Sequence, residues 1–256
     1  MGNLLGEAAP LEYLNADPGS VTVSGYSAGC YMAHRLQIIH SSQIKGAALY
    51  SCWPYGTTLD EAWEGYQGDE VDEWFYSSQQ SKLETASFDA ITEAALDDKI
   101  DPTSNLADAA VYIHTGLLDN VVPFWASRAV RGVYRMLGAS KIDYEQEKIG
   151  HEDPENKMVQ GLMRLYIQLG YYSDQSEFEE PAFDYESLGT FTDFAQSEFV
   201  GIDSTLPEQK EWVRYLTYWH DAGKIYIPDA CYEDKCRVHV TFHDCTSSAD
   251  AIAQYS

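Results

Sequence analysis

Residues 21–33 read VTVSGYSAGCYMA and combine a β-branched run, a glycine-rich turn and the start of a helical pattern. Val21–Val23 has the composition of a buried strand, and apolar residues recur at helical spacing from Cys30 to His40. The turn Gly25-Tyr26-Ser27-Ala28-Gly29 matches Gly-x-Ser-x-Gly, which between a strand and a helix is typical of a nucleophile elbow. Such an elbow presents the serine hydroxyl at a helix N-terminus, where the dipole favours a developing anion. The pattern predicts Ser27 as a catalytic nucleophile, with a small-residue turn without chemistry as the alternative.

Composition narrows the class of protein. The chain has 256 residues, enough for one sizeable hydrophobic core, so we expect a single α/β domain over residues 1–256. Its formal net charge of -25 argues against nucleic acid and anionic membrane surfaces as partners, because both would repel it. No stretch approaches the roughly 20 apolar residues of a membrane span. The chain does not open with a basic segment followed by an apolar one, so we expect no signal peptide within it.

The spacing of the cysteines indicates whether the protein works in an oxidising or a reducing compartment. Cys231 and Cys236 bracket a tight polar turn just before a predicted strand. We expect a local disulfide there rather than half of a zinc site, because no second ligand pair follows at zinc spacing. A disulfide indicates an oxidising compartment, so we expect an extracellular, secreted protein. The pairing of Cys30, Cys52 and Cys245 stays open, and we expect neither a metal nor a cofactor.

Three further strands are predicted by short apolar or alternating runs, at residues 46–50, 110–114 and 141–148. The carboxyl ends of parallel strands share one edge of a sheet, so the loops after these strands should meet near Ser27. The loop after the first run contains Trp53 and Tyr55. Both are candidates for substrate contact, with loop packing as the alternative.

A candidate acid and a candidate base follow two of these strands. Asp119 comes after the run at 110–114, and His151 follows the run at 141–148 in a Gly-His loop. The order serine, aspartate, histidine, each beyond a strand, is that of the α/β-hydrolases. In such a triad the aspartate fixes the imidazole tautomer and stabilises the imidazolium that forms when histidine takes the serine proton. The pattern predicts Ser27, Asp119 and His151 as the catalytic residues.

Other residues remain alternatives for these roles. Asp119 could instead cap a turn or helix just after it. Asp143 and Asp153 are rival acids, and His220 and His243 are rival bases.

Two segments are expected to add to a simple hydrolase sheet. Residues 57–108 are acidic and mostly helical in pattern, with residues 83–96 the clearest helix, and we interpret them as a helical insertion. Residues 171–222 are rich in acids and aromatic side chains. This composition predicts either a lid or rim around the site, or a subdomain packed by its own aromatic residues.

A last strand is indicated by Val238, Val240 and Phe242, which alternate before His243-Asp244-Cys245. That ending is close to the oxyanion loop of esterases, which donates a backbone N–H to the tetrahedral intermediate. In the usual hydrolase order this strand precedes the nucleophile. We expect the strand that begins near Arg237 to lie in the sheet of the elbow, next to Val21–Val23 or one position removed. Placing it in that sheet requires a circularly permuted chain.

These blocks, in this order, resemble the poly(3-hydroxybutyrate) depolymerases, and the permuted order is similar to the single-domain fungal type within that family. The resemblance rests on the elbow through Ala33, the Gly116–Pro123 acid loop, the Gly150-His151 loop, residues 191–199 and residues 236–245. It implies a circularly permuted α/β-hydrolase with a mostly parallel central sheet flanked by helices. It also implies that the oxyanion donors are the backbone N–H groups of Ala28 and Cys245.

The resemblance also implies an activity. A serine esterase of this family would hydrolyse poly(3-hydroxybutyrate) or a related polyhydroxyalkanoate through an acyl-enzyme intermediate. A carboxylesterase for small or plant-derived esters and a non-catalytic truncated relative are the alternatives. We expect a monomer that takes a polyester or a small ester as its substrate.

The chain departs from the family pattern at two places. Asp244 stands where the family has glycine, and it tolerates a glycine-like backbone less easily. A carboxylate at this position would also work against a developing oxyanion. The chain ends eleven residues after Cys245, whereas the family continues with a helix and a further core strand. We therefore expect a C-terminally truncated chain.

Overall fold

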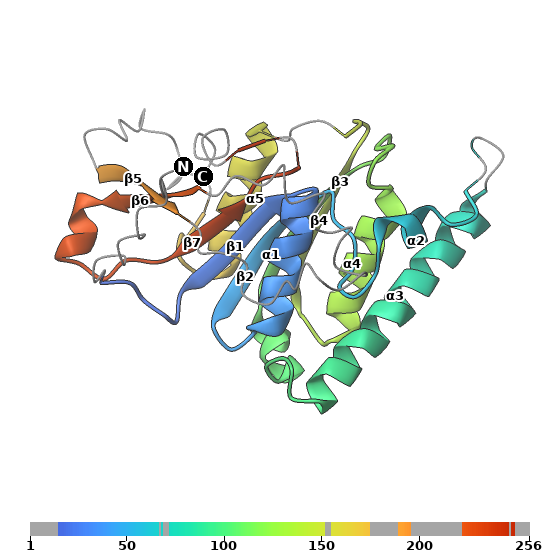
Figure 1. Cartoon of the computed structure of the whole chain (residues 1–256), viewed down its shortest axis with the longest axis horizontal. Coiled ribbons are helices and arrows are strands. Elements are labelled where there is room, and N and C mark those ends of the chain that lie inside the picture. Colours follow the sequence, from blue (N-terminus) through green and yellow to red (C-terminus); the bar gives the residue numbers. More distant parts are fainter. Residues whose placement is uncertain are drawn as a thin grey trace, which may run out of the picture.

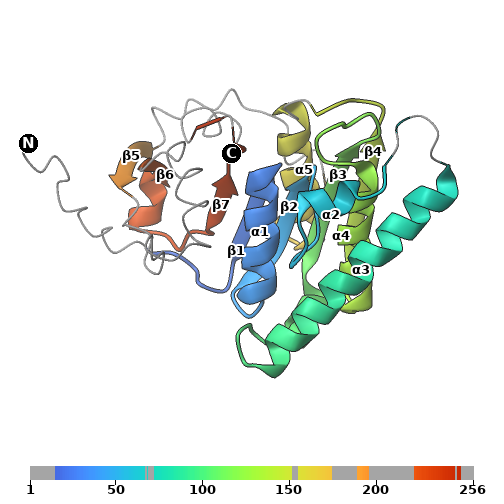
Figure 2. The same cartoon turned by 45° about the vertical axis from the view of Figure 1, so that its right-hand side comes forward.

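The main sheet is parallel and is covered by helices on both faces (Figure 1, Figure 2). The computed structural model describes residues 15–66, 68, 72–151, 155–174, 189–195, 222–245 and 247–248. The strand order is β4-β3-β2-β1-β7, and each neighbouring pair is parallel. The strands are β1 (Val21–Tyr26), β2 (Ile44–Tyr50), β3 (Ala110–Gly116), β4 (Lys141–Glu147) and β7 (His239–Phe242). The predicted α/β class with a mostly parallel sheet is confirmed.

Alternation along the strands gives each face of the sheet its own helix layer. In β2, Ala47 and Leu49 pack with α1 and α4 on one face, whereas Ala48 and Tyr50 pack with α5 on the other. Figure 2 shows α3 lying along α4, outside the layer that touches the sheet. The helices are α1 (Ala28–Ile39), α2 (Leu59–Trp63), α3 (Glu73–Leu96), α4 (Phe124–Met136) and α5 (Glu155–Gln168), with 3-10 turns at Thr103–Asp108 and Asp229–Tyr232.

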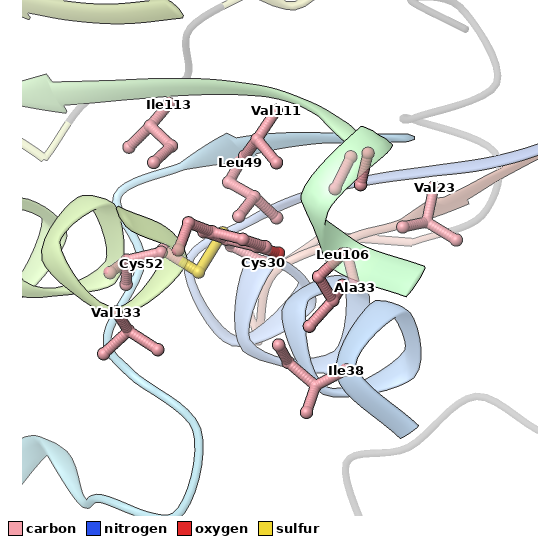
Figure 3. Close-up of a cluster of buried hydrophobic side chains, with 14 of the residues drawn as sticks. Val23, Cys30, Ala33, Ile38, Leu49, Cys52, Leu106, Val111, Ile113 and Val133 are labelled. Carbon is pink, nitrogen blue, oxygen red and sulfur yellow. A yellow bond between two sulfur atoms is a disulfide. The ribbon is translucent and has the colours of Figure 1, made fainter. Parts of the chain in front are cut away.

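All five cysteines lie within the described residues, and four of them form disulfides. Cys30, in the first turn of α1, is bonded to Cys52, in the loop after β2. This bond is fully buried in the core between the sheet, α1 and α4 (Figure 3). Cys231 is bonded to Cys236, and Cys245 is unpaired and exposed. The buried disulfide ties the helix of the elbow to the loop that follows the neighbouring strand.

β7 lies beside β1, although it is the last described strand of the chain. Its register pairs Val240 with Val23. The His239 ring supports this pairing, because its Nδ1 lies 2.8 Å from Thr22 Oγ1 and its Nε2 lies 2.8 Å from Ser24 Oγ. The predicted position of this strand in the sheet of the elbow is therefore confirmed.

The segments outside the main sheet differ from the predictions in extent. Helix α3 begins at Glu73, ten residues before the predicted start at Leu83, because Asp72 caps it by accepting the N–H of Phe75 at 3.0 Å. Residues 189–195 and 222–228 form an antiparallel pair, β5 (Gly189–Ala195) and β6 (Ala222–Pro228). Most of the segment predicted as a lid or rim, residues 175–188 and 196–221, lies outside the described residues. None of the described helices is long and apolar enough to cross a membrane.

His34 of α1 should make the stability of the protein depend on pH. Its ring is fully buried, with Nδ1 3.0 Å from the Tyr134 hydroxyl, and among the described residues its Nε2 has no hydrogen-bond partner. Burial lowers the pKa of His34 from 6.5 to about 3. The unfolded chain therefore binds this proton more readily, so the contribution to stability is complete above pH 6.5 and is lost as the pH falls toward 3. Between pH 7 and pH 5 the free energy of unfolding should fall by roughly 2 kcal/mol through this group.

Urea unfolding at the two pH values checks this expectation. A His34→Phe variant lacks the titrating group, so its loss of stability between pH 7 and pH 5 should be smaller by roughly 2 kcal/mol. Burial also lowers the pKa of His239, to about 4, but His239 acts equally in both proteins and cancels in the comparison. Equal pH dependence in the two proteins would contradict the assignment to His34.

Candidate active site

The turn between β1 and α1 is tightly packed and strained at Ser27. This residue has φ 56° and ψ -120°, which residues other than glycine rarely adopt. A Cβ atom on Gly25 would lie 2.3 Å from the carbonyl oxygen of Gly29, and one on Gly29 would lie 2.2 Å from the carbonyl oxygen of Phe242. Both positions therefore require glycine. The turn holds Ser27 at the N-terminus of α1, as its sequence pattern predicts.

Asp119 lies in the loop after β3, and its side chain is fully buried. Its Oδ1 accepts hydrogen bonds from the N–H groups of Val121 and Val122, at 2.9 and 2.8 Å. Its Oδ2 accepts from the Ser51 hydroxyl at 3.0 Å and lies 2.8 Å from His151 Nδ1. The carboxylate therefore caps the turn through one oxygen and contacts the imidazole through the other. The capping role considered as an alternative and the contact with His151 occur in the same side chain.

His151 lies between the other two side chains. Its Nε2 is 3.1 Å from Ser27 Oγ, and its Nδ1 faces Asp119. A carboxylate only accepts hydrogen bonds, so Nδ1 carries the proton and Nε2 presents its lone pair to the serine hydroxyl. The Tyr26 ring stacks on the imidazole, with the ring centroids 5.0 Å apart. The three side chains thus meet at the distances that activation of a serine by a general base requires.

The loops that carry Asp119 and His151 are bound directly to each other. The N–H of Leu118 donates to the carbonyl of Ile149 at 2.9 Å. A Cβ atom on Gly116, the last residue of β3, would lie 2.5 Å from that same carbonyl oxygen. Glycine at this position therefore permits the close approach that brings the two loops together.

One of the two amides predicted as oxyanion donors lies in the elbow itself. Ala28 is the first residue of α1 and directly follows Ser27. The carbonyl oxygens of Phe242 and His243 lie within 2.4 Å of the position of a Cβ atom on Gly29. The end of β7, which leads into Asp244 and Cys245, therefore lies against the first turn of α1, where the helix dipole stabilises negative charge.

Trp53 and Tyr55 pack among side chains of the protein itself. Both are half-buried in the loop after β2. The Trp53 ring stacks on Tyr31 of α1, with the centroids 4.8 Å apart, and the Arg35 guanidinium lies 5.8 Å from the centre of the Tyr55 ring. Part of each ring is therefore covered by contacts within the protein, which favours the alternative that these residues pack the loop.

The rival residues are placed differently. Asp143 Oδ2 lies 3.4 Å from Arg164 Nη1, on the outer strand β4. The Nδ1 of His243 lies 2.7 Å from the backbone oxygen of Asp244. Asp153 and His220 lie outside the described residues.

One residue at the site was not identified from the sequence. Ser51 directly follows β2, is buried, and contacts Asp119. Its place after a predicted strand was the available signal, because the carboxyl ends of these strands meet at one edge of the sheet. Within the described ranges, no group of three histidine, cysteine, aspartate or glutamate side chains could hold a metal ion.

Known proteins resemble this chain in sequence and in fold. No family model matches the chain. The chain is 25% identical over 275 residues to a poly(3-hydroxybutyrate) depolymerase from Delftia acidovorans, with 96% of this chain and 49% of that protein covered. The chain thus spans about half the length of this curated relative.

Two solved structures are similar over nearly the whole chain. A PHB depolymerase complexed with an R3HB trimer gives a TM-score of 0.57 at 18% identity, with 96% of this chain and 76% of that one covered. The PHB depolymerase from Penicillium funiculosum gives a TM-score of 0.56 at 18% identity, with coverages of 96% and 77%. The resemblance predicted from the sequence is confirmed, and the fold is that of these proteins.

Proposed function

We propose that this chain, a relative of the poly(3-hydroxybutyrate) depolymerases, is a serine esterase with Ser27, Asp119 and His151 as its catalytic triad. The observation that supports this most directly is the position of His151, which contacts Ser27 Oγ through one ring nitrogen and Asp119 through the other. The strained backbone at Ser27 adds support, because such strain concentrates at active sites.

The chemistry follows from these contacts. Ser27 Oγ attacks the carbonyl carbon of the ester while His151 Nε2 takes the serine proton. The bond to the alcohol oxygen then breaks, His151 returns the proton to that oxygen, and the acyl group stays on Ser27. Water attacks the acyl-enzyme with His151 again as base, which releases the acid and restores the serine. Asp119 stabilises the imidazolium in both halves of the reaction.

The tetrahedral intermediate needs donors for its oxyanion. The N–H groups of Ala28 and Cys245 are the proposed donors, because the first turn of α1 and the end of β7 are packed together beside Ser27. Partial burial of the sulfur in this otherwise exposed residue, and then the carboxylate of Asp244, raise the pKa of the Cys245 thiol. Asp244 therefore disfavours negative charge in the loop that would bind the oxyanion.

An Asp244→Gly variant should accordingly be faster than the wild type. We expect kcat on p-nitrophenyl butyrate to rise about fivefold, which corresponds to roughly 1 kcal/mol, the upper range for charges near a surface. The gain should shrink in high salt, because salt screens this repulsion. Asp229→Gly, which removes a surface carboxylate from the turn after β6, is the control and should leave kcat unchanged. An unchanged or lower kcat for Asp244→Gly would contradict the role of Asp244.

The proposed substrate is a polyhydroxyalkanoate. The support is the name of the curated relative and the name of the solved structure with an R3HB trimer. Secretion is also part of the proposal, because two disulfides are typical of proteins from oxidising compartments. So is the circular permutation, since β7 pairs with β1 from the far end of the described chain. We further propose that residues 1–256 form one hydrolase domain, with Trp53 and Tyr55 at the rim of its site.

A labelling experiment tests the activity. A fluorophosphonate probe should modify Ser27, and mass spectrometry of the labelled peptide identifies the residue. Turnover of p-nitrophenyl butyrate should accompany clearing of a poly(3-hydroxybutyrate) suspension. Turnover of the small ester without clearing would assign the chain to the carboxylesterases for small esters. Absence of labelling and of both activities would leave a non-catalytic relative.

A further inference from the structure

We propose that Ser51 is a positioning residue, which holds the Asp119 carboxylate in the orientation from which it contacts His151; this inference rests on the proposed esterase function. Ser51 is buried, and its hydroxyl donates to Asp119 Oδ2 at 3.0 Å. That same oxygen lies 2.8 Å from His151 Nδ1. Ser51 therefore contacts the one carboxylate oxygen on which the orientation of the imidazole depends.

The backbone at Ser51 is strained and is held from several sides. Its φ is 50°, in the left-handed region, which such a residue adopts when the surrounding structure imposes it. Its N–H donates to the carbonyl of His114 in β3 at 3.0 Å. The next residue, Cys52, exchanges two hydrogen bonds with the Ser127 hydroxyl of α4 and is bonded to Cys30 of α1. β3, α4 and α1 together fix the place from which the Ser51 hydroxyl acts.

The two oxygens of Asp119 are held by different parts of the chain. Oδ1 accepts two N–H groups from its own loop, at residues 121 and 122. Among the described residues, the partners of Oδ2 are the Ser51 hydroxyl and the His151 ring. Ser51 holds this second oxygen from the end of β2, which is the strand next to β1. Ser51 thereby couples the position of the acid to the strand that neighbours the nucleophile.

Replacement of the hydroxyl measures its contribution. Ser51→Ala should lower kcat on p-nitrophenyl butyrate about ten- to hundredfold, the usual size of a hydrogen bond to a charged group, with KM nearly unchanged. Ser41→Ala is the matched control, because Ser41 is also buried and donates to the backbone carbonyl of Pro102, in another part of the molecule. It should leave kcat and KM unchanged. Ser51→Gly removes the hydroxyl and relieves the backbone strain, so it should fold well and lose as much kcat as Ser51→Ala.

A double-mutant cycle with Asp119→Asn separates positioning from general support of the fold. Measured by the rate of fluorophosphonate labelling in both backgrounds, Ser51→Ala should cost about ten- to hundredfold when Asp119 is present. In the Asp119→Asn background it should cost less than twofold, because the carboxylate that Ser51 orients is absent. The proposal would be overturned if Ser51→Ala lowered the labelling rate by the same factor in both backgrounds. It would also be overturned if Ser51→Ala and Ser51→Gly both left kcat unchanged. A wild-type protein that neither reacts with the probe nor hydrolyses the ester would overturn the proposed function, and this inference with it.

Discussion

Replacing Ser27 by alanine should lower kcat for hydrolysis of p-nitrophenyl butyrate by about 10⁶, the size of the loss when the nucleophile of a triad is removed. Alanine has no oxygen to attack the ester, so no acyl-enzyme forms. In the native protein His151 Nε2 lies 3.1 Å from the serine oxygen. In the alanine variant the ring has no hydroxyl to deprotonate. The remaining rate would come from binding and from the backbone donors beside the elbow.

The fold should survive this change, because alanine keeps the Cβ atom and meets the same strain at φ 56°. The melting temperature should therefore stay within a few degrees of the wild-type value, and labelling by the fluorophosphonate should disappear. Ser20→Ala is a suitable control, since the buried Ser20 hydroxyl donates to the carbonyl of Asp17 before β1 begins. It should keep full activity and full labelling. A Ser27→Ala protein with near wild-type turnover would exclude Ser27 as the nucleophile.

Replacing Asp119 by asparagine should lower kcat by about 10⁴ without unfolding the protein. The reason lies in the two N–H groups, from residues 121 and 122, that bind Oδ1. They require an oxygen at that position, so the asparagine must place its NH₂ group where Oδ2 stands. That NH₂ group would then donate to His151 Nδ1, which forces the imidazole proton onto Nε2. A protonated Nε2 cannot accept the proton of Ser27.

Asp143→Asn is the matched control, because Asp143 is the rival acid and its replacement by asparagine removes the same negative charge as Asp119→Asn. Its carboxylate pairs with Arg164 instead of His151, so kcat should stay within about twofold of wild type, as expected for a surface ion pair. Steady-state kinetics on the p-nitrophenyl ester measures both variants. A large loss in Asp143→Asn together with a small loss in Asp119→Asn would transfer the role of acid to Asp143.

The elbow is the part of the site that the sequence describes best, because its determinants are local. A strand composition, two glycines and a helical period occur within 13 residues. A Cβ atom on these two glycines would lie 2.3 and 2.2 Å from backbone carbonyl oxygens, so only glycine fits at either position. The turn type can therefore be recognised before any tertiary contact is known.

The meeting of Ser27, Asp119 and His151 at one site could also be predicted, since parallel strands bring their carboxyl ends to one edge of the sheet. The structure adds the distances of 2.8 and 3.1 Å that join the three side chains. The placement of the strand before Cys245 was predicted through the resemblance to a family. Periodicity alone predicts that this segment is a strand and leaves its neighbour undetermined.

The sequence by itself thus determined the elbow turn, the strands of the main sheet and the order of the candidate site residues, because these depend on neighbours along the chain. Only the tertiary structure decided the pairing of Cys30 with Cys52, the stacking of Trp53 on Tyr31 and the contact of Ser51 with Asp119. Ser51 and Asp119 are 68 positions apart, and they meet because β2 and β3 are adjacent in the sheet. No local pattern encodes such a contact, since it arises from how strands and helices that are distant in sequence pack around a shared core.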